Sequence, residues 1–222
     1  LGLVGSEMCI RDRVCPLCTH DDISTYHSHP HRQFWQCTNC ALVFVSPADY
    51  PDADAEKARY DQHHNDPTDK RYRAFLQQLA TPLLERLTVG SIGLDFGCGP
   101  GPALAHILQE SGMTVELYDT YYAPNDTVWA TQYDFVTATE VVEHLHQPSQ
   151  DFDRLFRVLK PGGWLAIMTK WVSRIPSFTA SRYVRDMTHV CLYSPETFNW
   201  IARRWNSPVD FPKTDIALFR KG

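Results

Sequence analysis

The chain has 222 residues, of which 43% are hydrophobic and 21% are charged. This composition suits one ordinary globular domain with a small accessory module. The net charge of −5 provides no basic field for nucleic acid, and no apolar run approaches the roughly 18–20 residues of a membrane helix. We therefore disfavour a nucleic-acid partner, without excluding one, and expect no membrane partner.

The N-terminal stretch LGLVGSEMCIRDR differs from the rest of the chain. It begins with Leu1 instead of Met and shows no clear periodicity. It also lacks the basic start, apolar core and small-residue cleavage site of a signal peptide. The stretch resembles translated adapter sequence at the edge of a gene prediction. We therefore expect residues 1–13, including Cys9, to be a non-native leader outside the fold.

Two CxxC pairs mark a small module over residues 14–47. Cys15 and Cys18 form the first pair, Cys37 and Cys40 form the second, and positions 19–36 lie between them. This spacing is typical of a structural zinc site. Two CxxC turns bring four thiolates to one ion and complete a closed tetrahedron with bonds of about 2.3 Å. Because the intervening segment is too short to build a core, the Zn²⁺ ion would supply most of its folding energy.

Other chemistry in this module is less favoured. A redox CxxC normally opens a helix inside a βαβ unit, whereas strand-like residues flank the second pair here. Four thiolates already fill a zinc site, so the loop histidines are expected to be solvated: His20, His27, His29 and His31. Thiols in this pattern, in a chain without an export signal, indicate a reducing compartment, and we expect a cytoplasmic protein.

Residues 48–88 read as a helical linker and cap. The stretch TDKRYRAFLQQLATPLLERL has apolar residues at helical spacing and Thr68 or Asp69 to cap its start. It predicts an amphipathic helix that packs on the next domain, with Pro82 expected to kink or break it. Four side chains are placed to cover a ligand, although ordinary surface positions are the favoured interpretation: Tyr60, His63, His64 and Tyr72.

The main domain, residues 89–222, opens with a strand, a glycine-rich loop and a helix. SIGLDF reads as the buried strand and PALAHILQESG as the helix. Glycines between them permit a tight turn and close approach of a ligand at the carboxyl end of the strand. Pro100 and Pro102 remove N–H donors that a pyrophosphate would need, and Pro102 replaces the last glycine of the dinucleotide fingerprint. The loop therefore suits a ligand without phosphates and disfavours a nicotinamide dehydrogenase.

The later segments continue the alternation of strands and helices. MTVELYD ends in Asp119, placed to accept hydrogen bonds from both hydroxyls of a ribose. YDFVTATEVVEHL predicts a strand followed by an acidic, histidine-bearing loop. FDRLFRVLKPGGWLAIMTKW predicts a helix, a Pro-Gly-Gly turn and a strand, and VDFPKTDIALFRKG predicts a final strand or hairpin.

Four of these motifs, in this order, carry a resemblance. LDFGCGPG, the acid of LYD, YDFVTATEVVEHL and LKPGGWLAI resemble the class I S-adenosylmethionine-dependent methyltransferases, and the match covers most of the main domain. The resemblance implies an α/β fold with a doubly wound, mostly parallel, seven-stranded-type sheet, like that of Rossmann folds. The front module is similar to the zinc ribbons attached to some bacterial members.

The resemblance also implies roles for residues. The residues that would hold the methionine part of the cofactor S-adenosyl-L-methionine are Asp95, Gly97, Gly99 and Gly101. Asp119 would hold the ribose, and Glu140, after the fourth strand, would line the site near the sulfonium or the substrate. A strand-end cap is the alternative interpretation of Asp95.

One segment departs from the family pattern. Asp119 and Tyr133 are separated only by TYYAPNDTVWATQ, where the family usually places a helix and a further strand whose end helps to bind adenine. This short stretch cannot hold both elements, which leaves the adenine contacts open. Tyr121, Tyr122 or Trp129 would stack on the ring, or would equally serve as core residues.

Methyl transfer from a sulfonium is a direct displacement, in which the reacting atoms must lie in line about 3–3.5 Å apart. A base is needed only for an acceptor that carries a proton. The candidates are Glu143, His144, His146 and His189. His189 lies in RYVRDMTHVCLYSPETF, an insert between late strands where such domains build substrate pockets, and histidine titrates near working pH. A structural role is the alternative for each of them.

Three classes of function follow. The favoured one is an S-adenosylmethionine-dependent methyltransferase acting on a small molecule or a sugar. The second is an RNA methyltransferase that binds RNA through its ribbon. The basic and aromatic residues Arg32, Phe34 and Trp35 favour it, whereas the acidic residues Asp21 and Asp22 oppose it. A non-catalytic S-adenosylmethionine-binding protein is the third. The sequence does not indicate the acceptor or the oligomeric state.

Overall fold

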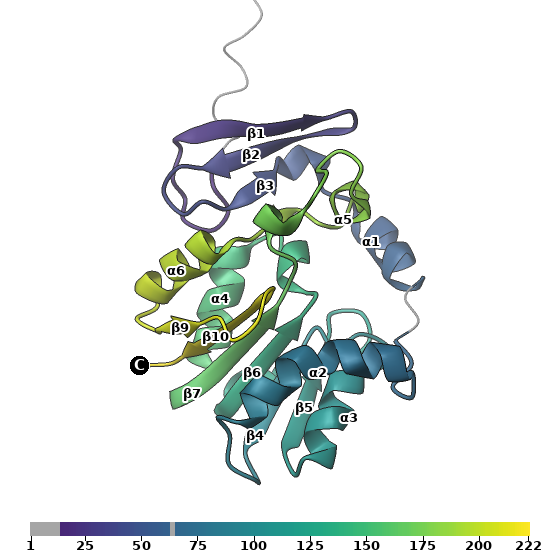
Figure 1. Ribbon diagram of the computed structural model, residues 1–222, viewed down its shortest axis with the longest axis vertical. Coiled ribbons are helices and arrows are strands. Elements are labelled where there is room, and N and C mark those ends of the chain that lie inside the picture. Colours follow the sequence, from purple (N-terminus) through teal and green to yellow (C-terminus); the bar gives the residue numbers. More distant parts are fainter. Residues whose placement is uncertain (1–13, 63–64) are drawn as a thin grey trace, which may run out of the picture.

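We describe a computed structural model of the chain, which defines residues 14–62 and 65–222 (Figure 1). The expected leader, residues 1–13, and two candidate ligand-covering side chains, His63 and His64, lie outside these described residues. Within them, no helix has both the length and the apolar character needed to cross a bilayer.

The main sheet has six strands in the order β5-β4-β6-β7-β10-β9 (Figure 1). The first four are parallel to one another, and β10 and β9 are antiparallel additions at one side. The expected mostly parallel α/β sheet is confirmed. The strands are β4 (Ile92–Phe96), β5 (Thr114–Tyr118), β6 (Tyr133–Thr139), β7 (Leu159–Met168), β9 (Val209–Asp210) and β10 (Ile216–Arg220).

Helices cover both faces of this sheet. One face packs on α2 and α3, and the other packs on α4 and α6. Neighbouring residues of β6 point to opposite faces. Phe135 packs in the apolar cluster with α2 and α3, and Val136 packs in the cluster with α4 and α6. The doubly wound arrangement is therefore confirmed. The helices are α2 (Lys70–Leu84), α3 (Ala103–Glu110), α4 (Pro148–Arg157) and α6 (Pro195–Arg204).

The sheet has six strands because one crossover is missing. The segment after Asp119 forms an isolated bridge to Ala123 and the 3-10 helix η3 (Asp126–Ala130), and then enters β6. As the short spacing predicted, no further strand fits there among the described residues. β5 is consequently an edge strand of the main sheet.

The Pro-Gly-Gly segment differs from the expected turn. β7 runs through it without a break, while the register against β6 jumps from Tyr133↔Leu159 to Phe135↔Trp164. The extra residues form a bulge, and Gly162 takes a positive φ of 77° within it. A long strand with a bulge thus replaces the separate turn and strand.

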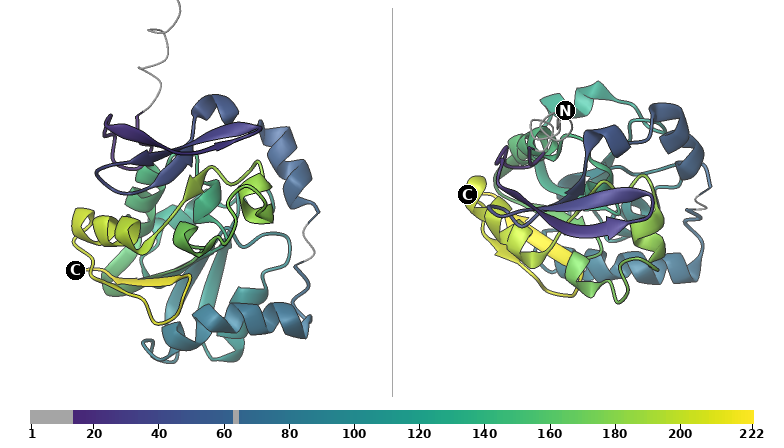
Figure 2. Two further views of the ribbon diagram at one scale, coloured as in Figure 1. Left: turned by 45° about the horizontal axis from the view of Figure 1, so that its top comes forward. Right: turned by 90° about the horizontal axis from the view of Figure 1, so that it is seen from above.

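The front module forms a second, small antiparallel sheet at one end of the main sheet (Figure 2). Its strands are β1 (Ile23–His29), β2 (Arg32–Cys37) and β3 (Val43–Val45). A fourth strand comes from far along the chain, because β8 (Cys191–Leu192) pairs with β3 through Val43↔Leu192 and Phe44↔Cys191. The module is therefore joined to the main domain by strand pairing.

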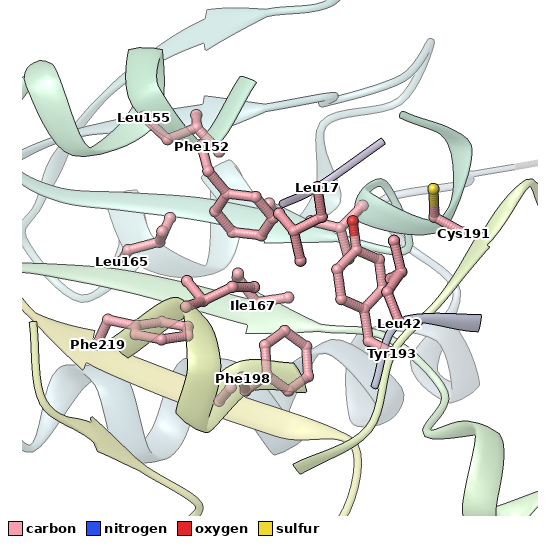
Figure 3. Packing of buried hydrophobic residues seen from close by; sticks show 14 of the residues in the cluster. Leu17, Leu42, Phe152, Leu155, Leu165, Ile167, Cys191, Tyr193, Phe198 and Phe219 are labelled. Carbon is pink, nitrogen blue, oxygen red and sulfur yellow. The ribbon is translucent and has the colours of Figure 1, made fainter. Parts of the chain in front are cut away.

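The module also shares its core with the main domain. Leu17 and Leu42 are at most 1% exposed and pack in one cluster with Phe152, Ile167 and Tyr193 (Figure 3). These side chains come from the module, α4, β7 and the position directly after β8. Burial of such residues is worth about 1.5–3 kcal/mol each, so the module contributes to the stability of the whole chain.

The connector contains η2 (Pro47–Asp49), α1 (Ala53–Tyr60) and α2. Asp69 caps α2, and the apolar face of this helix packs on α3, as expected. The expected break at Pro82 is wrong, because the helix continues to Leu84. Pro82 lies so near the C-terminus that it interrupts only the last turn. The remaining short helices are η4 (Val142–His144), η5 (Val172–Arg174) and α5 (Arg182–Arg185).

Candidate functional site

A cavity of about 540 Å³ opens at the carboxyl ends of β4, β5 and β6. Its size is that of a small-molecule pocket, and its place is where open α/β sheets bind ligands. The walls come from the glycine loop, the turn after β5, the loop after β6, α1, α2 and the insert before β8. Side chains and backbone that line it include Asp95, Gly97, Gly99, Gly101, Asp119, Tyr121, Tyr122, Glu140, His144 and His189.

The glycines of the loop are required by close neighbours. Gly97 has a φ of +74°, and a Cβ placed on it would lie 2.4 Å from the Val141 side chain. At Gly101 a Cβ would lie 1.9 Å from the carbonyl oxygen of Asn65. Because these approaches are far shorter than van der Waals contact, any side chain would push away the segments that enclose the loop.

The tip of β5 holds the glycine loop directly. The amide of Gly99 donates a hydrogen bond of 3.0 Å to Asp119 Oδ2, while Tyr121 and Tyr122 donate from their amides to Oδ1 at 2.8 and 3.1 Å. A carboxylate has about four acceptor positions, so these three amides leave room for one further donor. Asp119 therefore faces the cavity as an acceptor already fixed in orientation.

Asp95 lies beneath the loop at the end of β4. It is 4% exposed and accepts a hydrogen bond of 2.7 Å from Thr137 Oγ1. Burial raises the pKa of Asp95 to about 7, despite the hydrogen bond from Thr137, and the nearby Asp119 adds to the rise. Asp95 thus lies at the cavity, where a ligand-binding residue was expected, and also makes a structural hydrogen bond to the neighbouring strand β6.

The aromatic residues after β5 separate into two groups. Tyr121 and Tyr122 line the cavity. Trp129 packs in the core instead, with its ring 4.9 Å from that of Tyr118 and 6.0 Å from that of Phe96. The two tyrosines remain available for stacking on an aromatic ligand, whereas Trp129 supports the wall behind them.

Helix α1 closes one side of the cavity, through residues that sequence reasoning missed. Glu56 is 8% exposed and accepts a hydrogen bond of 2.9 Å from Tyr121 Oη, and His146 Nε2 lies 2.9 Å from its other oxygen. Arg59 bonds Asp186 at 2.7 Å across the cavity mouth. Nothing in the polar sequence of α1 marks these side chains, because their partners lie far along the chain.

Tyr60 and Tyr72, two of the candidate covering side chains, line the cavity from α1 and α2. Glu140, at the end of β6, lines it with an exposed side chain and a positive φ of 54°. Non-glycine residues rarely adopt this left-handed backbone conformation, and those that do are concentrated at functional sites. The strained turn projects Glu140 toward the space in front of the glycine loop.

Three of the four candidate bases, Glu143, His144 and His189, lie together. The rings of His144 and His189 are 4.6 Å apart, and Glu143 is fully buried beside them. Burial lowers the pKa of His189 to about 4 and, together with His189, that of His144 to about 3. Both imidazoles are therefore neutral at physiological pH. His146 is set apart, stacked on Tyr50 at 4.4 Å.

The front module supports this wall of the cavity. Arg32 of β2 is 4% exposed, and its guanidinium donates to the carbonyls of Val184, Asp186 and Met187 at 2.6, 2.6 and 3.1 Å. These carbonyls belong to the insert that carries His189. The module thus braces the insert instead of projecting away from it.

The four cysteines of the two CxxC pairs meet at one point. The sulfur atoms of Cys15 and Cys40 are 3.5 Å apart, those of Cys18 and Cys37 are 3.4 Å apart, and all four lie within 4.8 Å of one another. Sulfurs in a tetrahedral zinc site with bonds of about 2.3 Å are about 3.8 Å apart. The donor set and spacing therefore fit one metal ion, and the distances exclude disulfides.

A family model described as a methyltransferase domain matches residues 62–206 of the chain. The chain belongs to this methyltransferase family. The match spans the helix α2, the main sheet through β7, the insert and α6, and it contains every wall of the cavity except α1. A comparison of the sequence with curated proteins gave no match.

Several solved structures share the fold, and two of those that follow are named as methyltransferases. The 1,6-didemethyltoxoflavin-N1-methyltransferase of Burkholderia thailandensis, solved with 1,6-didemethyltoxoflavin and S-adenosylhomocysteine, is similar over 89% of this chain and 98% of its own, with 15% identity and a TM-score of 0.54. An O-methyltransferase family protein from the same species matches 78% of this chain at 18% identity and a TM-score of 0.50; the chain spans 64% of its length. The PH0226 protein of Pyrococcus horikoshii OT3 matches 74% of this chain and 99% of its own, with 13% identity and a TM-score of 0.51.

Proposed function

We propose that this protein is an S-adenosylmethionine-dependent methyltransferase that acts on a small molecule. The observation that carries the proposal is the pairing of the glycine loop with Asp119 at the mouth of a 540 Å³ cavity. A loop that lacks N–H donors at Pro100 and Pro102, next to a carboxylate acceptor, suits a nucleoside without phosphates. The toxoflavin enzyme, which shares the fold, was solved with S-adenosylhomocysteine and a small-molecule substrate.

The cofactor would occupy the side of the cavity formed by β4 and β5. Asp119 would accept from the ribose, and Tyr121 or Tyr122 would stack on the adenine. The loop glycines, Asp95 and Glu140 would surround the methionine part. The buried hydroxyl of Thr139 has no hydrogen-bond partner among the described residues and lines the same space, so it offers a further polar contact.

The acceptor would then occupy the opposite side, against His144, His189 and the insert. Once bound, the cofactor supplies an electrophilic methyl group, and the chain must align the acceptor with it. Burial keeps both imidazoles neutral, and the lowered pKa values make them weak bases, so they suit orienting the acceptor by hydrogen bonds better than removing its proton. α1 covers this space and limits the entry of water.

An RNA acceptor is the less favoured alternative. Two of the module residues that would grip RNA, Arg32 and Phe34, are at most 4% exposed; Arg32 bonds the insert, and Phe34 packs on Phe178 just before it. Because the Arg32 guanidinium is buried and already bonded to backbone carbonyls, it offers no contact to the phosphates of RNA. A small molecule that enters the cavity agrees better with this arrangement.

Calorimetry with S-adenosylhomocysteine tests the cofactor half of the proposal. We expect one site per chain, and no binding at millimolar ligand would contradict the function. Incubation of metabolite extracts with a labelled methyl donor then tests the acceptor. Cofactor binding without label transfer to any small molecule would favour the non-catalytic alternative, and salt-sensitive transfer to RNA would favour the ribbon-dependent one.

We also propose that the four cysteines hold a structural Zn²⁺ ion. The sulfur spacing and the closed set of four thiolates support this assignment, since catalytic zinc sites keep an open position. Elemental analysis of the purified protein is expected to find one zinc per chain that survives dialysis. Metal-free protein with the same stability would contradict it.

A further inference from the structure

Two histidines and a glutamate on the acceptor side of the cavity form a second group with metal-binding geometry. One potential ligand atom from each of Glu143, His144 and His189 lies within 4.8 Å of the other two. Ligands bound to one ion at about 2.0–2.2 Å are at most about 4.4 Å apart, so side-chain shifts of less than about 1 Å would bring all three to one centre. This group is distinct from the four cysteines.

The hydrogen bonds of both imidazoles select the nitrogen that would bind. His144 Nδ1 lies 3.0 Å from the carbonyl of Thr188, and His189 Nδ1 lies 2.8 Å from the carbonyl of Tyr183. A carbonyl only accepts, so Nδ1 of each ring carries a proton, and Nε2 is the nitrogen left to bind an ion. Donation from one ring nitrogen to a backbone carbonyl is the usual support of a metal-binding histidine.

Glu143 has an unsatisfied oxygen at this point. The side chain is 0% exposed, and Thr169 Oγ1 donates to Oε2 at 2.9 Å. Among the residues that the structure describes, Oε1 has no hydrogen-bond partner. A buried carboxylate oxygen without a partner is costly, and a bound cation would remove this cost.

A backbone hydrogen bond joins the two segments that bear these ligands, η4 and the insert. Val190 donates from its amide to the carbonyl of Glu143 at 2.8 Å, which ties the insert to the segment after β6. The three ligands are thus positioned before any ion arrives, and Arg32 stabilises the insert from the other side. Such preorganisation lowers the entropic cost of binding.

We propose that Glu143, His144 and His189 bind a divalent first-row transition-metal ion. Two imidazoles and one carboxylate leave open coordination positions, as in sites that take a further oxygen ligand. His144 and His189 line the cavity, so these positions face the acceptor side. The ion would hold water there, or an oxygen of the acceptor; the latter role rests on the proposed methyl transfer.

Manganese(II) is a suitable probe, because it is paramagnetic and prefers oxygen and nitrogen ligands to the thiolates of the zinc site. Zinc-loaded protein is titrated with Mn²⁺, and free Mn²⁺ is followed by electron paramagnetic resonance. We expect one Mn²⁺ per chain, at least tenfold weaker binding in Glu143→Gln, His144→Gln and His189→Gln, and no change in His106→Gln. His106 is an exposed histidine on α3 that does not line the cavity.

Pulsed electron paramagnetic resonance of the unsubstituted protein covers the case in which a variant fails to fold, since it detects imidazole nitrogens bound to Mn²⁺. Two such nitrogens support the site. Absence of Mn²⁺ binding, absence of nitrogen coupling, or equal affinity in the folded ligand variants would overturn it. Calorimetry with S-adenosylhomocysteine on the same samples separates the two proposals, because cofactor binding without Mn²⁺ binding rejects the metal site and leaves the methyltransferase function standing.

Discussion

The amide of Gly99 donates a hydrogen bond of 3.0 Å to the carboxylate of Asp119. The two residues lie at the tips of adjacent parallel strands, and the bond fixes the spacing between the glycine loop and the acid. Asp119 therefore shapes the loop, and in the proposed function it would also accept a hydrogen bond from the ligand. Changes at either residue are expected to affect both.

Asp119→Asn tests this double role. The amide keeps the size of the side chain and loses the charge that strengthens its hydrogen bonds. Hydrogen bonds to charged groups contribute about 1.5–3 kcal/mol, so we expect the affinity for S-adenosylhomocysteine to fall about 10- to 100-fold by calorimetry. Asp126→Asn, at an exposed acid on η3, is the matched control. Equal affinity in both variants would remove Asp119 from the binding site.

Gly101→Ala tests the enclosure of the loop. The new Cβ would lie 1.9 Å from the Asn65 carbonyl oxygen, so the segment that enters α2 must move. We expect a lower melting temperature together with at least tenfold weaker binding of S-adenosylhomocysteine. Gly90→Ala introduces backbone strain at a φ of +88° in open space, and is expected to lower stability only. Unchanged binding in Gly101→Ala would show that Asn65 yields without cost.

Asp95 should give the stability a pH dependence. Burial raises its pKa to about 7 in the folded protein, whereas an unfolded aspartate titrates near about 3.9. Between these two pH values the folded state retains a proton that the unfolded state has lost. The contribution of Asp95 to the unfolding free energy is therefore fully present below about pH 3.9 and is lost as the pH rises to about 7. In Asp95→Asn we expect the unfolding free energy, measured with urea, to fall less across this range. A profile that matches those of the wild type and Asp126→Asn would contradict the assignment.

Arg32→Gln tests the support of the insert by the front module. The substitution removes a buried guanidinium that donates to three carbonyls of residues 184–187. We expect faster hydrogen exchange in this segment by mass spectrometry, while the affinity for S-adenosylhomocysteine changes less than about twofold, because the cofactor side does not contact Arg32. Arg71→Gln, on the exposed surface of α2, is the control. If hydrogen exchange became faster only in the front module and not in residues 184–187, the result would contradict the proposed support of the insert by Arg32.

Cys37→Ser should destabilise the whole chain through the proposed zinc ion. Loss of one thiolate opens the site, and the module shares its apolar core with α4 and β7. We expect a lower melting temperature in a single transition and loss of bound zinc. Cys191→Ala, at a buried thiol outside the cluster, should retain zinc. Separate melting of the module would indicate that the shared core contributes little.

The cofactor side of the cavity was predictable because its signals are local. A buried strand, a glycine loop and a helix follow one another between Ile92 and Glu110, and Asp119 ends the next strand. The short spacing to Tyr133 also predicted the missing strand. Local patterns are strong where backbone conformation and burial are decided within one turn or one strand.

The acceptor side was only partly predictable. Glu143, His144 and His189 were singled out, but their assembly depends on the contact of η4 with the insert. The cover provided by Glu56 and Arg59, and the buried position of Arg32, depend on partners in distant parts of the chain. Such contacts arise from tertiary packing, for which a single sequence carries no periodic signal.

The pairing of β3 with β8 has a consequence for biosynthesis. Phe44 pairs with Cys191, so the chain must emerge from the ribosome as far as Cys191 before this contact can form. Until then the nascent chain exposes a hydrogen-bonding edge and an apolar patch around Leu42. Long-range closure of this kind slows folding, and chaperones that shield the emerging front module would raise the yield of native protein.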